Sequence, residues 1–200
     1  MTPETKRLAA KALIGSLGWK AGGTPPTAKK AVIIAAPHTS NLDGVLLVSF
    51  AWNFGVDIQW MVKDSVMSTP LLGRFVRNVG GVAIDRSKSK DVVSAMVQAM
   101  QQRDELLLVV SPPGTRSLRE HWKSGFYYIA QRAGVPLVCS YLDYAKKEGG
   151  FGPTIPVTGN VKADMDRLRE FYRDVTARYP EQVTPVRLAS EEQPSVIPTR

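Results

Sequence analysis

Apolar residues of the chain fall into short continuous runs that are separated by stretches with helical spacing. Runs such as "AVIIAA" (31–36) and "ELLLVV" (105–110) are typical of strands buried on both faces of a parallel sheet. Further strands are expected at 56–63, 80–85 and 135–144, and helices at 5–18, 41–54, 69–80, 89–102, 124–133 and 162–178. Strands that alternate with helices predict an α/β fold: a single domain with a mostly parallel sheet flanked by helices.

Both ends of the chain differ from this middle part. The first expected helix carries an apolar stripe with basic residues beside it, which predicts an N-terminal amphipathic helix. The stripe comprises Leu8, Ala12, Leu13 and Leu17, and the basic residues are Lys6, Arg7 and Lys11. "GGTPPTAKK" is typical of a linker, and the last twenty residues, rich in Pro, Thr, Glu and Ser, of a loose tail. We therefore expect a helix and linker at 1–28, a central domain at 29–180 and a flexible tail at 181–200.

Charge and cysteine content narrow the partners and the compartment. The formal net charge is +8, and the basic surplus lies in residues 1–30, with six Lys/Arg against one Glu, and in 63–123, with ten against six acids. Such a surplus favours an anionic partner: a membrane surface, a phosphorylated substrate, an acidic carrier or nucleic acid. The single cysteine, Cys139, permits no internal disulfide and favours a reducing compartment. We expect neither a signal peptide nor a bilayer-spanning stretch, hence a cytoplasmic location.

The first of the two histidines, His38, comes directly after the strand expected at 31–36, and Asp43 follows five residues later. The carboxyl edge of such a sheet is where ligands usually bind. From the loop, the His38 imidazole can reach the Asp43 carboxylate, which would fix its tautomer and stabilise the imidazolium. No serine with a nucleophile elbow is present, so such a base would act on a hydroxyl of the substrate. Alternatively, Asp43 completes a capping box with Ser40, and His38 is a loop histidine bonded to a carbonyl.

Two more stretches place an arginine after an expected strand. "GGVAIDRS" contains Arg86, and "SPPGTRS" contains Arg116. A guanidinium group in such a place suits a phosphate, because it can donate two parallel hydrogen bonds. Gly114, Thr115 and Ser117 offer backbone N–H groups and hydroxyls to the same anion. Each stretch alone also fits a turn with solvated arginines, but parallel strands bring the three strand ends to one edge.

Taken in order, these stretches resemble the glycerolipid acyltransferase family, which includes the 1-acylglycerol-3-phosphate acyltransferases. "HTSNLD" matches the family's motif of His and Asp separated by four residues, and "SPPGTRS" is similar to its third block. "WMVKDSVMSTPLLGRFVRNVGGVAIDRS" resembles the second block, whose recurring places are held by Lys63, Pro70, Gly73, Asp85 and Arg86. "WKSGFYYIAQRAGVPLV" resembles the segment that ends in the fourth block at Val135 and Pro136. The resemblance covers roughly residues 31–141.

This resemblance implies an O-acyltransferase of phospholipid biosynthesis. A fatty acyl group would pass from a thioester, acyl-CoA or acyl carrier protein, to the hydroxyl of a phosphorylated, lysophosphatidic-acid-like acceptor. His38 would be the general base and Asp43 would orient it, whereas Arg86 and Arg116 would hold the phosphate. Lys63, Gly114, Thr115 and Ser117 would complete the substrate site. The family implies no metal and no cofactor apart from the acyl donor, and the basic amphipathic helix adds a peripheral position on the anionic inner face of the membrane.

One block departs from the family pattern. The third block is usually Phe-Pro-Glu-Gly-Thr-Arg-Ser, but Ser111 and Pro113 stand here in place of its Phe and Glu. A proline supplies no carboxylate and also removes a backbone donor, so the identity of the acyl acceptor does not follow from the resemblance. Another lyso-lipid, an amino-acid lipid and a glycolipid are the alternatives. A further alternative function is a basic module that binds lipid or nucleic acid without catalysis. No nucleic-acid recognition motif is present, however, so no nucleic-acid partner is expected.

Overall fold

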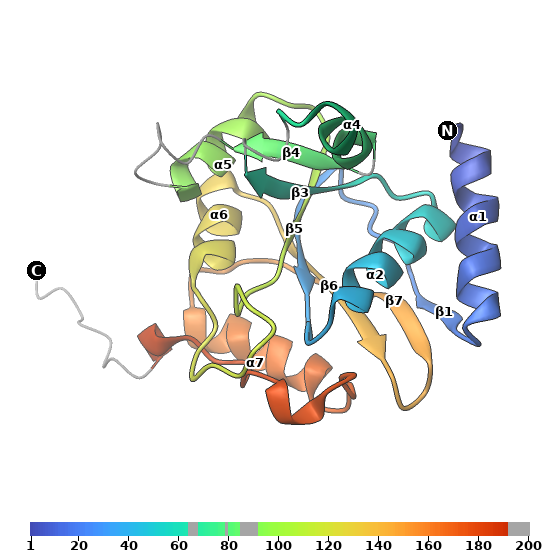
Figure 1. The fold of residues 1–200 in the computed structure, drawn as a ribbon. Helices are drawn as coiled ribbons and strands as arrows, with labels where there is room; N and C mark the ends of the chain where they lie inside the picture. Colours follow the sequence, from blue (N-terminus) through green and yellow to red (C-terminus); the bar gives the residue numbers. More distant parts are fainter. Residues whose placement is uncertain (64–67, 79, 85–91, 192–200) are drawn as a thin grey trace, which may run out of the picture.

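The computed structural model of the chain describes residues 1–63, 68–78, 80–84 and 92–191. These residues form an α/β domain around one twisted sheet, as the sequence predicts (Figure 1). The described part of the sheet has seven strands in the order β1-β7-β6-β2-β5-β3-β4. The strands are β1 (Lys20–Gly23), β2 (Lys30–Ala35), β3 (Ile58–Lys63), β4 (Gly81–Ile84), β5 (Leu106–Val110), β6 (Leu137–Asp143) and β7 (Glu148–Ile155). All neighbouring strands pair in parallel except β6 and β7, which form an antiparallel hairpin.

Helices cover both faces of the sheet, and the central strand β2 serves both. Val32 and Ile34 point into a core shared with α5, α6 and α7, whereas Ala31 and Ile33 point toward α2 on the other face. The helices are α1 (Pro3–Ser16), α2 (Asn41–Phe54), α4 (Pro70–Asn78), α5 (Val92–Gln101), α6 (Gly125–Ala133) and α7 (Val161–Tyr172). Because both faces are covered, β2 is apolar at consecutive positions, and this explains why its continuous run predicted a buried strand.

Helix α1 packs against α2 at the side of the domain (Figure 1), but not through the stripe expected from the sequence. Its buried residues are Ala10 and Ile14, neither of which belongs to that stripe. Leu8 is instead 65% exposed, and Leu13 and Leu17 are each 37% exposed. The helix is therefore part of the domain and still presents leucines to the outside. None of the described helices is long and apolar enough to cross a bilayer.

Two strands, β1 and β7, were not expected from the sequence, which predicted a linker and a loop there. Both are rich in glycine, and the glycines are what allow the elements to approach. Gly23 has a φ of 74°, and a Cβ on it would lie 1.7 Å from the Phe151 carbonyl oxygen of β7. A Cβ on Gly149 would lie 2.4 Å from the Phe50 ring of α2. Close backbone packing thus replaces the alternating side-chain pattern that identifies ordinary strands.

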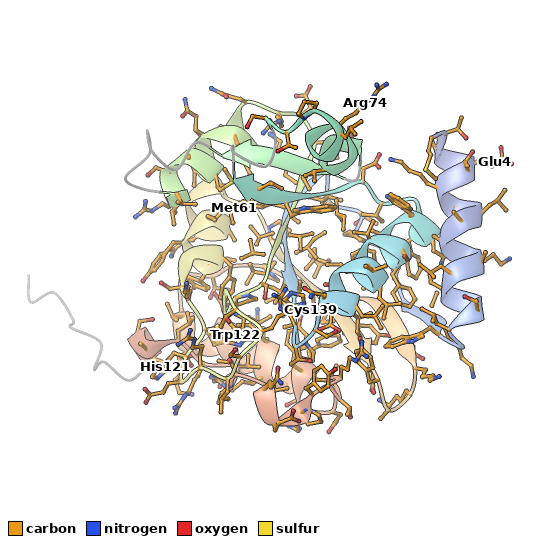
Figure 2. The ribbon with its side chains drawn as sticks, viewed as in Figure 1. Glu4, Met61, Arg74, His121, Trp122 and Cys139 are labelled. Atoms are coloured by element: carbon orange, nitrogen blue, oxygen red, sulfur yellow. The ribbon has the colours of Figure 1, made fainter. Side chains whose placement is uncertain are left out.

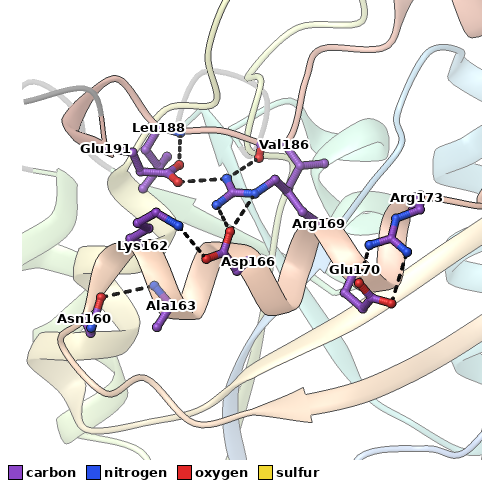
Figure 3. A network of polar contacts seen from close by, with 10 residues as sticks. All are labelled: Asn160, Lys162, Ala163, Asp166, Arg169, Glu170, Arg173, Val186, Leu188 and Glu191. Atoms are coloured by element: carbon purple, nitrogen blue, oxygen red, sulfur yellow. Dashed lines mark hydrogen bonds and ion pairs between the residues drawn. The ribbon is translucent and has the colours of Figure 1, made fainter.

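The C-terminal part of the chain also departs from the prediction. Helix α7 ends at Tyr172, six residues before the expected end at 178, and residues 181–191 fold back onto the domain instead of forming a loose tail. Leu188 is buried and pairs with Trp122, on the loop before α6 (Figure 2). Arg169 of α7 fixes the segment, because its guanidinium group donates to the Val186 carbonyl and pairs with Glu191 (Figure 3).

Candidate active site

Ser40 determines how the loop after β2 turns into helix α2. Its backbone is extended and its hydroxyl accepts a hydrogen bond from the Asp43 N–H, while the Asp43 carboxylate accepts one from the Ser40 N–H. This reciprocal capping box starts the helix at Asn41 and brings the Asp43 carboxylate back over the loop. The capping box that the sequence offered as one role of Asp43 is therefore present.

The same carboxylate also faces the histidine. His38 Nδ1 lies 3.5 Å from Asp43 Oδ2, which is within ion-pair distance. The His38 side chain is 23% exposed and the Asp43 side chain 4%, so the pair has a buried carboxylate and an accessible imidazole. Because Nδ1 is turned toward the carboxylate, Nε2 lies on the opposite side of the ring and is the nitrogen available to a bound molecule. Capping and pairing are thus two uses of one side chain, not alternatives.

Asp43 is held by an unusual number of donors. Oδ2 accepts from the Thr39 and Ser40 N–H groups at 2.7 and 2.8 Å, and Oδ1 accepts from the Ser40 hydroxyl and from the Tyr144 hydroxyl at 2.6 Å. Burial by itself would raise the pKa of Asp43, but the hydrogen bonds from His38, Ser40 and Tyr144 outweigh it and hold that pKa well below its usual range. The carboxylate is therefore charged at any physiological pH.

The loop after β5 brings Arg116 to the same edge of the sheet. Arg116 Nη1 donates a 2.6 Å hydrogen bond to Oδ1 of Asn41, the first residue of α2. Within the loop, the Gly114 N–H bonds to the Ser111 carbonyl and the Ser117 N–H to the Thr115 hydroxyl, so these two amide groups are already used. The loop consequently presents the Arg116 guanidinium group and the Thr115 side chain, and not a row of free amide groups.

Two expected site residues cannot be compared with the prediction. Arg86 lies outside the described residues, and so does the side chain of Lys63, whose backbone ends β3. The parallel register still shows where the edge is, because Lys63 pairs with Ile84 and Ile34 with Val110. Among the described residues, no group of three or more His, Cys, Asp and Glu side chains is arranged to hold a metal ion.

His38 and Asp43 are among the residues that line a large groove along α2. The groove has a volume of about 890 Å³, which lies within the range of small-molecule sites. It is lined mainly by apolar residues of α2, β3, β5 and α1: Leu13, Val45, Leu47, Val48, Trp52, Trp60, Met61, Val109 and Val110. Figure 2 labels Met61 on β3, one of the strands that contribute residues to the groove. His38 thus joins a polar dyad to an apolar channel.

A second, smaller pocket also has His38 in its lining. It is lined by His38, Thr39, Pro113 and Thr115, together with residues of the segment after α7 such as Gln182 and Thr184. The Thr184 hydroxyl accepts a hydrogen bond from the Arg119 N–H, and its carbonyl one from the Trp122 indole, so this wall is firmly attached. The expected flexible tail therefore contributes to the surroundings of the histidine.

Sequence reasoning missed Asn41 and Tyr144 as members of the site. Asn41 lies inside the "HTSNLD" motif, and its position at the helix start was the one signal that could have identified it. Tyr144 is 101 positions away from Asp43 in the chain and follows β6 directly. Only the rule that strand ends meet at one edge of a sheet would have pointed to it.

A family model described as Acyltransferase matches residues 21–142, which include the whole dyad and the loop after β5. The chain belongs to the acyltransferase family. The crystal structure of the 1-acyl-sn-glycerophosphate (LPA) acyltransferase PlsC from Thermotoga maritima has a similar fold, with a TM-score of 0.60 over 88% of this chain and 80% of that one. At 14% sequence identity, this likeness shows the fold of the acyltransferase family and no more.

Curated relatives in the acyltransferase family are similar in sequence over the same region. The 1-acyl-sn-glycerol-3-phosphate acyltransferase of Saccharomyces cerevisiae is 29% identical over 64% of this chain and 43% of its own length. The probable 1-acyl-sn-glycerol-3-phosphate acyltransferase of Mycoplasma pneumoniae is 32% identical over 55% of this chain and 43% of its own length. The chain thus spans less than half the length of these curated relatives.

Proposed function

We propose that the protein transfers a fatty acyl group from a thioester to the hydroxyl of a lysophosphatidic-acid-like acceptor. The observation that carries the proposal is the position of His38: its Nδ1 faces the charged Asp43, and both residues line an apolar groove. Family membership and the names of the relatives support the same reaction class.

His38 acts as the general base. Its Nε2 takes the proton of the acceptor hydroxyl while the hydroxyl oxygen attacks the thioester carbonyl carbon, and Asp43 stabilises the imidazolium that forms. The tetrahedral intermediate collapses with cleavage of the C–S bond, and the leaving thiolate takes the proton back from His38. An ester and a free thiol result. The thioester is already activated, so the proposal needs a base, positioning and stabilisation of the oxyanion, and no metal or resident cofactor.

The groove along α2 holds the acyl chain. Its walls are Val48 and Trp52 on the helix and Trp60 and Val109 on the sheet, and an alkyl chain bound there is removed from water. The thioester carbonyl is then at the His38 end, where the chain leaves the groove. The donor is acyl-CoA or acyl-acyl carrier protein, which share this thioester chemistry.

The acceptor approaches from the side of Arg116. This guanidinium group is fixed by Asn41 next to the dyad, and it offers the remaining N–H groups to a phosphate. Arg86 and Lys63 stay part of the expected phosphate site through the sequence resemblance alone, since Arg86 and the Lys63 side chain lie outside the described residues. Pro113, where the family has Glu, lines the small pocket beside His38, so an acceptor other than lysophosphatidic acid is the alternative that a specific residue favours.

The membrane is the source of the acceptor in this proposal. Leu8 on the outer side of α1 is exposed, and Arg7 and Lys11 flank it, so the helix suits an anionic lipid surface. Leu13 of the same helix lines the groove. Contact of α1 with the inner face of the membrane would therefore bring the groove close to the lipid phase.

The experiment is an acyl-transfer assay with product identification. The purified protein is incubated with a labelled long-chain acyl-CoA or with the matching acyl carrier protein, and with lysophosphatidic acid, a lysophospholipid with a head group, an amino-acid lipid or a glycolipid. Thiol release and the mass of the product are measured. Asp43→Asn is the variant, and Asp166→Asn, which changes an exposed carboxylate of α7, is the matched control.

We expect an acylated product with one acceptor class, a large loss in Asp43→Asn and no loss in Asp166→Asn. An acylated lysophosphatidic acid supports the leading acceptor, and a product from another acceptor supports the alternative that Pro113 favours. Thioester hydrolysis without any acylated lipid, or an Asp43→Asn protein as active as the control, would contradict the proposed function.

A further inference from the structure

Tyr144 occupies the turn between β6 and β7, and that turn is built to hold it in place. Asp143, buried at the end of β6, accepts hydrogen bonds from the Ala145 and Lys146 N–H groups and thereby fixes the turn. The Tyr144 N–H donates to the Thr176 carbonyl at 2.8 Å, which ties the residue to the segment after α7. Its backbone is thus anchored from two elements.

The Tyr144 ring is fixed from a third direction. The Trp19 ring, in the corner between α1 and β1, packs edge-on against it with centroids 4.8 Å apart. Lys147 joins the same corner to the turn, because its side chain donates to the Leu17 carbonyl and its own carbonyl accepts from the Lys20 N–H. The half-buried tyrosine therefore has little freedom to turn away from its partner.

That partner is the carboxylate of the dyad. The Tyr144 hydroxyl donates to Asp43 Oδ1 at 2.6 Å, whereas the histidine faces Oδ2. The two oxygens of one carboxylate are thereby divided between a tyrosine and a histidine. The Ser40 hydroxyl and two backbone N–H groups also hold Asp43, so the carboxylate stays in place when the tyrosine hydroxyl is removed.

We propose that Tyr144 is a positioning residue that acts on His38 through Asp43: its hydroxyl donates to Oδ1 and takes up part of the charge of the carboxylate whose Oδ2 faces His38. This inference rests on the proposed function, since the dyad acts there as the base. Hydrogen bonds to an ionised acceptor draw on its charge, so the charge left for the imidazolium is smaller than that of a free carboxylate. Tyr144 thereby moderates the attraction between the Asp43 carboxylate and the His38 ring.

Other charged groups near the pair do not take this role. Burial and the bond to Asp43 raise the pKa of Tyr144 to about 12, so the hydroxyl keeps its proton and remains a donor. The charge of Arg178, from the segment after α7, instead lowers the pKa of Tyr144, and Arg116 is bound to Asn41. Tyr144 is the side chain that reaches Asp43 from outside its own loop in the described part of the chain.

The test compares Tyr144→Phe with Tyr127→Phe in the full chain. Tyr127 is the matched control, because its hydroxyl donates at 2.9 Å to a buried carboxylate, Asp164, between α6 and α7. The titration of His38 is followed by NMR in both variants, with no substrate. The chain has two histidines, and a His121→Gln variant assigns the two signals. The pH profile of kcat/KM is recorded in parallel, and melting temperatures show whether the variants fold.

In Tyr144→Phe, we expect the His38 midpoint and the acidic limb of kcat/KM to move together to higher pH. On that limb, kcat/KM falls about threefold to tenfold, since a shift of one unit changes the unprotonated fraction about tenfold. Tyr127→Phe is expected to change the melting temperature but neither curve. A Tyr144→Phe protein whose His38 titration coincides with wild type, or moves to lower pH, would overturn the inference. The NMR arm needs no activity, so this failure is separate from a failure of the proposed function, which Asp43→Asn reveals.

Discussion

Arg116 and Asn41 form a 2.6 Å hydrogen bond that joins the loop after β5 to the first turn of α2. The two residues are 75 positions apart in the chain, and their contact fixes a guanidinium group beside the dyad. An arginine that is already oriented loses less freedom when it binds an anion, so it discriminates well between charged and neutral ligands.

Replacement of Arg116 by alanine is expected to lower kcat/KM for a phosphorylated acceptor by roughly ten- to a hundred-fold, because a hydrogen bond to a charged group is worth ~1.5–3 kcal/mol. Arg116→Lys should restore only part of the lost kcat/KM, since lysine keeps the charge but cannot donate two parallel hydrogen bonds as the guanidinium group does. The measurement compares the phosphorylated acceptor with its dephosphorylated analogue. Arg119→Ala, in the same loop, is the control. Equal losses on the two acceptors would show that Arg116 does not bind phosphate.

Asp43 makes the stability of the domain depend on pH. Its pKa lies well below the ordinary value of 3.8, so its contribution to stability is present above about pH 4 and is lost as the pH falls toward the folded-state pKa. The gap in melting temperature between wild type and Asp43→Asn should therefore be largest at neutral pH and shrink below pH ~4. Thermal melts across that range measure it. A gap that is constant with pH would mean that Asp43 is not stabilised as an anion.

Most of the domain is predictable from sequence because β2 and β5 are continuous apolar runs and α2 begins at a capping box. The missed parts have physical reasons. Strands β1 and β7 depend on glycines that allow close packing, a feature without apolar periodicity. The apolar stripe of α1 did not show which face meets α2, because the helix packs through Ala10 and Ile14, which lie outside that stripe. His38 and Asp43 could be found locally, but Tyr144 required the topology.

The walls of the groove give a prediction about acyl chain length. Val48 of α2 lines the groove, and a larger side chain there fills part of its volume. Val48→Trp is expected to reduce transfer from a long-chain thioester about tenfold or more, because overpacking costs ~1–3 kcal/mol. Transfer from a short-chain thioester should persist, which provides an internal control for folding. Equal losses on both donors would place the acyl chain elsewhere.

Leu8 tests the contact with the membrane better than deletion of the N-terminus does. A deletion would also remove Ile14, Trp19 and strand β1, which belong to the domain. Leu8→Gln changes an exposed side chain and is expected to weaken binding to anionic vesicles about three- to tenfold, with an apolar contribution of ~1 kcal/mol. Leu118→Gln, another exposed leucine, is the control. Vesicle sedimentation at low and high salt measures the binding of each variant. Equal binding by Leu8→Gln and Leu118→Gln would contradict a lipid contact at α1.

The most direct test of the account is the rate of acyl transfer by His38→Gln. The amide preserves much of the shape of the imidazole but is no base, and His121→Gln makes the same chemical change at the other histidine. With the donor and acceptor identified by product analysis, the single-turnover rate of each folded variant is compared with wild type. The account predicts a loss of ~10²–10⁴ in His38→Gln and a rate close to wild type in His121→Gln. A folded His38→Gln protein that transfers the acyl group as fast as wild type would contradict it.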